Sequence, residues 1–162
     1  MSQNNQGHIQ SACGNAGRLI DYNQNNHWTI VGEWTPAMTD CAKYLNGRGV
    51  GARYDGSISK DAPRYGSCEG LTGPGWSFSE DYKDFLRQTW EAQVSSYKEP
   101  KMQYVLMTAS ARQKVITYEK ASGWIQWTWK TESADDWSYS AGLQYGWIPS
   151  DPTDHIYPNI CG

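Results

Sequence analysis

The sequence predicts an α/β fold, because two extended segments rich in β-branched and aromatic residues flank a segment with helical periodicity. The extended segments cover residues 28–32 and 123–129. Between them, apolar side chains recur at helical spacing from about residue 80 onward. Strands that alternate with helices are typical of a parallel sheet covered by helices. Two strands do not form a stable sheet alone, so we expect more strands in the complete fold.

The first extended segment ends at a glutamate. Residues 28–31 read Trp-Thr-Ile-Val, which indicates a short buried strand, and Gly32 would let the chain turn or a ligand approach closely. Glu33 follows directly. A parallel barrel places catalytic groups at this end of its strands, which makes Glu33 a candidate catalytic carboxylate. The alternative is an ordinary glutamate in a surface loop.

The remaining elements follow in order. Residues 1–27 are polar and predict a helix-and-loop stretch. Thr39-Asp40 could cap a short helix over residues 41–45, which Asn46-Gly47 would end. Residues 47–76 are rich in glycine and proline and predict a long loop, of the length that is usually functional or covalently fixed.

The long helix has the clearest signal. Ser77-Phe78-Ser79-Glu80 fits a capping box, and the apolar positions that follow have helical spacing. These positions are Tyr82, Phe85, Leu86, Thr89 and Trp90. We therefore expect a helix that begins near Glu80. The tail from Trp137 to Gly162 is predicted to be a loop.

Composition narrows the class of ligand. The formal net charge is -3, with 14 Lys and Arg against 17 Asp and Glu, so no basic surface points to nucleic acid. No apolar run approaches the roughly 18 residues of a membrane span. Phe is scarce at 2, whereas Trp at 9 and Tyr at 11 are abundant. Flat side chains with a polar edge suit ring-shaped, hydrated ligands such as sugars, although several must also fill the core.

Four cysteines are widely spaced, at positions 13, 41, 68 and 161. This spacing argues against zinc and is compatible with two disulfides in an oxidising compartment, with three possible pairings. The N-terminus is polar and predicts no signal peptide. An extracellular character without an export signal leads us to expect that the chain is incomplete.

Four blocks carry a resemblance to a known family. They are WTIVGEW, TDCAKYLNGRGVGARYDG, GWIQWTWKTESADDWSY and YGWIPSDPTDHIYPNICG. In this order they resemble the C-terminal part of fungal exo-1,3-β-glucanases, which are retaining glycosidases of glycoside hydrolase family 5. The resemblance covers nearly the whole chain and implies the last two β/α units of a (β/α)8 TIM barrel.

The resemblance also implies roles for individual residues. Glu33, after the seventh barrel strand, would be the nucleophile that forms a covalent glycosyl-enzyme intermediate. Trp127, at the end of the eighth strand, would be the aromatic platform under the sugar. The implied disulfides are Cys13–Cys161 and Cys41–Cys68. Two further tryptophans, Trp34 and Trp129, are expected to pack rather than bind, and two charged residues of the same block have no assigned role, Lys130 and Glu132.

The sequence departs from the family pattern in two ways. The general acid/base of the family lies in an Asn-Glu pair after the fourth strand, and no Asn-Glu dipeptide occurs here. General acid catalysis is worth about 10²–10⁴-fold, and the first six strands are also absent, so we expect the chain alone to be inactive. The second departure is an insert of about 21 residues, 94–114, between Gln93 and Val115.

The insert has two interpretations. Pro100 would break the helix expected there. Val94-Ser95 can be encoded as an intron start, Leu106-Met107 can encode a branch site, and Gln113 or Lys114 can encode an intron end. We therefore interpret 94–114 as a translated, unspliced intron. The alternative is a genuine loop insertion.

Taken with the resemblance, these observations predict one partial glycoside hydrolase domain over residues 1–162. The parent would release glucose from the non-reducing end of β-1,3-glucan with retained configuration, without metal or cofactor, as a secreted or cell-wall monomer. A parent that acts on β-1,6-glucan or transfers glucosyl units is a near alternative. A non-catalytic carbohydrate-binding module is a more distant one, because such modules are usually all-β.

Overall fold

The structure is a computed structural model that describes residues 3–94 and 123–162. Apart from Val94, the predicted insert lies outside the described residues. The elements, in chain order, are α1 (Gln3–Asn25), β1 (Ile30–Trp34), the 3-10 turn η1 (Gly75–Ser77), α2 (Glu80–Val94), β2 (Gly123–Gln126), the 3-10 turn η2 (Asp135–Trp137) and α3 (Tyr139–Tyr145). The predicted α/β class is confirmed. None of the described helices is long and apolar enough to cross a membrane.

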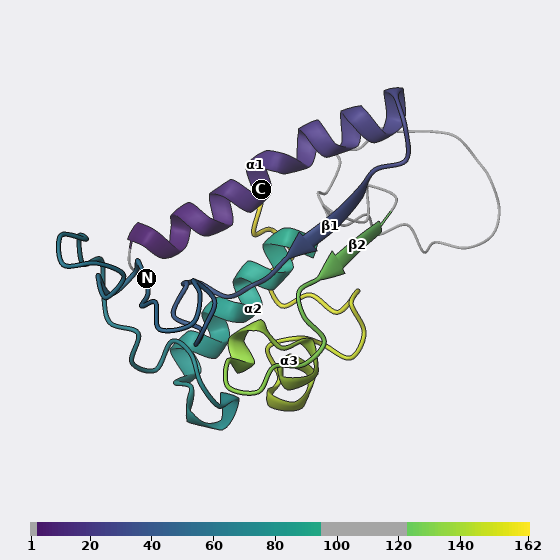
Figure 1. The fold of residues 1–162 in the computed structure, drawn as a ribbon. Helices are drawn as coiled ribbons and strands as arrows, with labels where there is room; N and C mark the ends of the chain where they lie inside the picture. Colours follow the sequence, from purple (N-terminus) through teal and green to yellow (C-terminus); the bar gives the residue numbers. More distant parts are fainter. Residues whose placement is uncertain (1–2, 95–122) are drawn as a thin grey trace, which may run out of the picture.

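The two strands lie side by side and run in the same direction (Figure 1). Ile30 pairs with Gly123, Val31 with Trp124 and Trp34 with Gln126. Between the last two pairs β1 advances three residues while β2 advances two, which is a β-bulge at Gly32-Glu33.

The strand boundaries correct two sequence predictions. The first strand begins at Ile30 rather than Trp28 and includes Glu33, which was expected just beyond it. Trp28, expected to be buried, is 91% exposed, because the strand has not yet begun there. The second strand ends at Gln126 rather than Trp129, because the backbone groups of Thr128 and Trp129 bond to residues 137–140 and not to β1.

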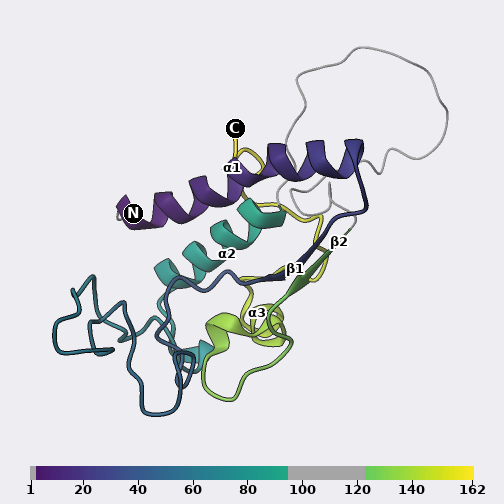
Figure 2. The same cartoon turned by 45° about the horizontal axis from the view of Figure 1, so that its top comes forward.

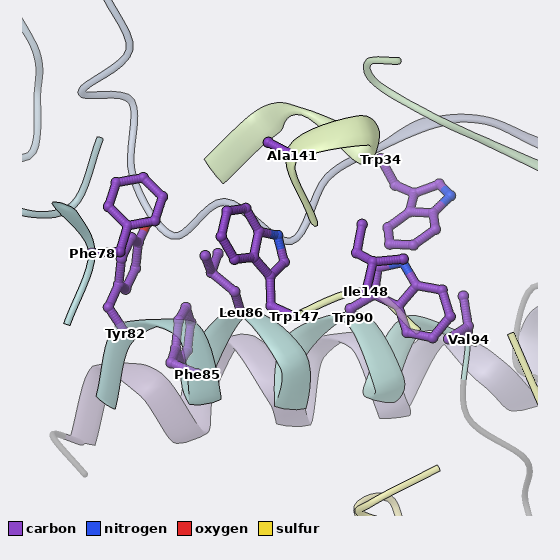
Figure 3. Packing of buried hydrophobic residues seen from close by; sticks show 10 residues of the cluster. All are labelled: Trp34, Phe78, Tyr82, Phe85, Leu86, Trp90, Val94, Ala141, Trp147 and Ile148. Carbon is purple, nitrogen blue, oxygen red and sulfur yellow. The ribbon is translucent and has the colours of Figure 1, made fainter. Parts of the chain in front are cut away.

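Helix α2 supplies most of the core. It begins near Glu80 as predicted, and its cap is Ser79, whose hydroxyl accepts from the Tyr82 amide at 3.2 Å. Leu86 and Trp90 are fully buried. Figure 3 shows the cluster that they form with residues of β1, of α3 and of the segment after α3. The ten residues of this cluster are Trp34, Phe78, Tyr82, Phe85, Leu86, Trp90, Val94, Ala141, Trp147 and Ile148.

The polar N-terminal stretch folds as helix α1, which lies along α2 in both orientations of the ribbon (Figures 1 and 2). Cys13 of α1 is bonded to Cys161 near the end of the tail, as the resemblance implied. The C-terminal tail is thus fixed to the helical layer.

The tail is also held by a buried carboxylate. Glu91, on α2, is completely buried and pairs with Arg87 one turn earlier. Its oxygens accept from the backbone amides of Ile156 at 2.9 Å and Tyr157 at 2.7 Å. Arg87 in turn donates to the Asp154 carbonyl at 2.6 Å. A buried ion pair is stable only when additional hydrogen bonds satisfy its charged groups. Here those hydrogen bonds are made to the backbone of the C-terminal tail.

The long loop after β1 is fixed by the Cys41–Cys68 disulfide, again the pair that the resemblance implied. The short helix predicted over residues 41–45 is absent, and the chain makes turns there. Asp40 does not cap these turns, because its carboxylate accepts instead from the amides of Arg53 at 2.9 Å and Tyr54 at 3.1 Å. Hydrogen bonds from these backbone amides and from Asn46 and Arg53 side chains lower the pKa of Asp40 to about 2 despite partial burial.

The predicted loop from Trp137 onward contains helix α3, which corrects the sequence prediction. Ser138 caps it, with its hydroxyl accepting from the Ala141 amide at 3.2 Å, and Gly146 ends it in the left-handed conformation at φ 90°. The segment Trp147-Ile148 that follows is buried in the core.

Candidate functional site

The sheet has one covered and one open face. Trp34 and Gln126 are buried, and the Gln126 side chain accepts from the Trp90 indole of α2 at 3.2 Å. Val31 and Trp124 also pack against the core cluster. Because side chains alternate along a strand, the remaining positions point to the opposite face. These are Ile30, Glu33, Ile125 and, just past β2, Trp127.

The open face is accessible. Ile30 is 61% exposed, Ile125 is 58% exposed and Trp127 is 52% exposed. Glu33 is also exposed. Large apolar side chains on the same face as a carboxylate, without cover from the described residues, indicate a surface that is completed by something else.

The bulge in β1 decides where Glu33 points. Without the extra residue, Val31 and Trp34 would lie on opposite faces of the sheet, since they are three residues apart. The bulge lets both face α2 while Gly32 and Glu33 share the open side. Glu33 therefore stands at the carboxyl end of β1, on the face away from the helix.

Trp127 lies at the corresponding end of β2. Its backbone amide donates to the Trp34 carbonyl at 2.8 Å, which extends the pairing of the strands by one bond. Gln126 before it faces α2, so Trp127 faces the same side as Glu33. The two residues that the resemblance marked as nucleophile and platform are thus on adjacent strands, at the same edge and on the same face.

The other residues of the expected site are dispersed. Trp34 packs in the core, edge-on to Trp124 with ring centroids 5.3 Å apart. Trp129 is 64% exposed but stacks on Tyr139 with centroids 5.8 Å apart. Lys130 and Glu132 are both exposed in the segment after β2. In the described part of the chain, no three metal-ligating side chains form a group that could hold an ion.

The sequence did not predict that one acidic side chain is buried. Asp136, in η2, is completely buried and its Oδ1 accepts from the Thr72 hydroxyl at 3.2 Å. Burial raises the pKa of Asp136, and the neighbouring Asp135 also raises it, while hydrogen bonds from Thr72 and Tyr82 lower it; together these effects place the pKa at about 7. The sequence carries no signal for this, because Asp135-Asp136 looks like an exposed pair in a loop.

Comparison with curated proteins finds several fungal glucan 1,3-β-glucosidases. No family model matches the chain. The chain is 38% identical over 156 residues to a glucan 1,3-β-glucosidase of Candida oleophila, a match that covers 96% of this chain and 30% of that protein. A glucan 1,3-β-glucosidase of Lachancea kluyveri is 36% identical over 159 residues, a match that covers 96% of this chain and 30% of that protein. A glucan 1,3-β-glucosidase of Blumeria graminis is 35% identical over 159 residues, a match that covers 96% of this chain and 31% of that protein. The chain therefore spans about a third of the length of these curated relatives.

Proposed function

We propose that this relative of the fungal glucan 1,3-β-glucosidases supplies the nucleophile edge of a β-1,3-glucan-cleaving site. The observation that carries the proposal is the placement of Glu33 and Trp127 at the same ends of two parallel strands, on the face away from α2. In a (β/α)8 barrel the helices lie outside, so that face would be the interior, and the carboxyl ends of strands carry the catalytic groups. The chain would be the C-terminal part of such a barrel, with β1 and β2 as its seventh and eighth strands.

In this mechanism Glu33 attacks the anomeric carbon of the terminal glucose from one face. The glycosidic bond breaks as the new bond to the carboxylate forms, and the leaving oxygen takes a proton from a second carboxylic acid. Water then attacks the glucosyl-enzyme ester with that second group as the base, which regenerates Glu33 and gives glucose with retained configuration. The Trp127 ring lies under the sugar and keeps it in position through both steps.

Glu33 needs a partner that this chain does not provide in the family position. The second carboxylate should lie about 5–5.5 Å from the nucleophile, and the family places it in an Asn-Glu pair. No such pair occurs among the 162 residues. The chain alone should therefore bind sugar weakly and not hydrolyse it.

Residues 94–114 enter this proposal as a retained intron. Val94 is the last residue of α2 and is buried in the core. Removal of 94–114 would bring Val115 directly after Gln93, so that a valine would still occupy this core position. The parent would be a secreted or cell-wall monomer that acts on β-glucan, without a metal or cofactor.

A chimaera tests this function. The upstream part of the Candida oleophila relative would be joined to this chain, with and without residues 94–114, and glucose release from a soluble β-1,3-glucan would be measured. Glu33→Gln should lower the rate at least about a thousandfold, because nothing else can form the covalent intermediate. The matched control is Glu132→Gln, which removes an exposed carboxylate and should leave the rate within about twofold. Equal loss in both variants would contradict the role of Glu33.

A further inference from the structure

The segment that follows β2 is held by the turn that contains Asp136. The Thr128 amide donates to the Trp137 carbonyl at 2.8 Å, and the Tyr139 amide donates to the Thr128 carbonyl at 2.8 Å. The Ser140 amide donates to the Trp129 carbonyl at 2.9 Å. The backbone directly after Trp127 is therefore fixed by residues 137–140 and not by the sheet.

That turn is itself attached to the loop before α2. The Asp135 amide donates to the Gly73 carbonyl at 2.9 Å, and the Asp135 carboxylate accepts from the Gly75 amide at 2.8 Å. Asp136 adds the bond from Thr72. The loop and the turn are thus joined by one hydrogen bond between backbone groups and by one hydrogen bond to each of two adjacent carboxyl groups, one partly exposed and one buried.

The surroundings of Asp136 do not suit a negative charge. Its Oδ2 is buried and has no hydrogen-bond donor among the described residues. From α2, the Tyr82 hydroxyl lies close enough to lower the pKa of Asp136, although it donates to the Leu71 carbonyl at 2.9 Å. The neighbouring charge with the strongest effect on it is Asp135, of the same sign. A buried carboxylate beside a second carboxylate is costly, and the neutral hydroxyls of Thr72 and Tyr82 do not offset the effect of burial.

We propose that Asp136 is a positioning residue that acts as a neutral carboxylic acid, joining the 71–75 loop and α2 to the turn that fixes Trp127. Ionisation of Asp136 would loosen this junction and let the Trp127 ring move from its position on the face that carries Glu33. The inference rests on the proposed function only in its last step, where Trp127 is the sugar platform.

The raised pKa of Asp136 determines how the stability of the fold changes with pH. The pKa of Asp136 is raised above its unfolded value, so folding favours the protonated form. The stabilisation is complete below about pH 4 and is lost as the pH rises through about 7. Tyr82 and Asp135, the groups that face Asp136, do not supply a compensating positive charge.

Two NMR signals of the full chain test the proposal without any sugar. These are the Asp136 carboxyl carbon and the Trp127 indole N–H, followed from pH 5 to pH 9. We expect both to change with one midpoint near pH 7. Asp136→Asn should hold the indole signal at its low-pH position throughout, and Glu132→Gln should leave the wild-type titration unchanged.

A second variant covers the case in which Asp136→Asn does not fold. Thr72→Val removes the hydroxyl that stabilises the carboxylate, so it should move the common midpoint to higher pH. An Asp136 carbon that titrates below pH 5 would overturn the proposal. So would an indole signal that does not follow it, or the absence of a resolved Trp127 signal at pH 5.

Binding of laminari-oligosaccharides separates this inference from the proposed function. We expect the dissociation constant of the wild-type chain to rise at least about threefold from pH 5 to pH 9, and that of Asp136→Asn to stay constant. Binding that needs Trp127 but keeps the same pH profile in Asp136→Asn would overturn the inference and leave the function standing. Coupled NMR titrations without binding at any pH would support the positioning role and contradict the sugar site.

Discussion

At the scale of single residues, the bulge at Gly32-Glu33 is the feature on which the site depends. It places Trp34 in the core and Glu33 on the open face, although the two are adjacent. The same alternation on β2 separates Gln126, which bonds to Trp90, from Trp127. A catalytic carboxylate and a sugar platform could thus be held by strands whose other side chains anchor the core.

Replacement of Trp127 by alanine tests the platform. The ring is 52% exposed on the open face, so its loss should weaken binding of laminari-oligosaccharides without unfolding the chain. We expect a loss of about 1 kcal/mol, or roughly fivefold in Kd, measured by isothermal titration calorimetry. Trp28→Ala is the matched control, because Trp28 is 91% exposed but precedes the other end of β1. Similar losses in both variants would move the platform away from Trp127.

At the scale of elements, α2 organises the molecule. One side of it supplies Leu86 and Trp90 to the core, and its buried Glu91 binds the backbone of the C-terminal tail. The tail after α3 contains turns but neither helix nor strand, so its path depends on this carboxylate and on the disulfide to α1.

Glu91→Gln should therefore destabilise the chain strongly. The change leaves the buried Arg87 guanidinium without a charged partner and turns an acceptor of two amides into a partial donor. The free energy of unfolding in urea should fall by about 3 kcal/mol. Glu80→Gln, at an exposed position of the first turn of the same helix, should change it by less than about 0.5 kcal/mol. A comparable effect of the two substitutions would mean that Glu91 does not anchor the tail.

The elements also show what the sequence could and could not predict. Helix α2 was predictable because its apolar spacing is a local signal, but its cap is Ser79 and not Ser77, the first residue of the predicted capping box. Helix α3 was missed although Ser138 and Gly146 are ordinary capping residues, because only seven residues separate them and the apolar pattern is short. The helix expected over residues 41–45 failed because Asp40 bonds to amides thirteen and fourteen residues away.

Only part of the candidate site could be predicted, because the rest depends on contacts between segments that are distant in the sequence. Glu33 and Trp127 were marked by their blocks, but the bulge that turns Glu33 to the open face depends on pairing with β2, about ninety residues later. The burial of Asp136 depends on Thr72 and Tyr82, from two other segments. Contacts between distant segments leave no periodic pattern in the sequence.

At the scale of the whole molecule, the described part is a parallel pair of strands with α1 and α2 on one side (Figure 2). Each strand has one edge without a pairing strand among the described residues, and the open face carries exposed isoleucines. Relatives about three times as long supply enough chain to cover this surface. Isolated from such cover, exposed strand edges tend to associate with one another.

The isolated chain should therefore self-associate through the open face. Ile125→Glu places a charge in the middle of that face and should lower the associated fraction several-fold, as measured by size-exclusion chromatography with light scattering. Val50→Glu, at a half-exposed position of the long loop, is the control and should have little effect. If both variants associate as the wild type does, another surface is responsible.

The proposed reaction depends on a covalent bond between Glu33 and the sugar. The most direct measurement is mass spectrometry of the chimaera after reaction with a 2-deoxy-2-fluoro-glucoside, which slows hydrolysis of the glucosyl-enzyme ester. We predict one added fluoroglucosyl group on the peptide that contains Glu33, and none in Glu33→Gln. A label on a different carboxylate, or glucose released with inverted configuration, would contradict the assignment of Glu33 as the nucleophile.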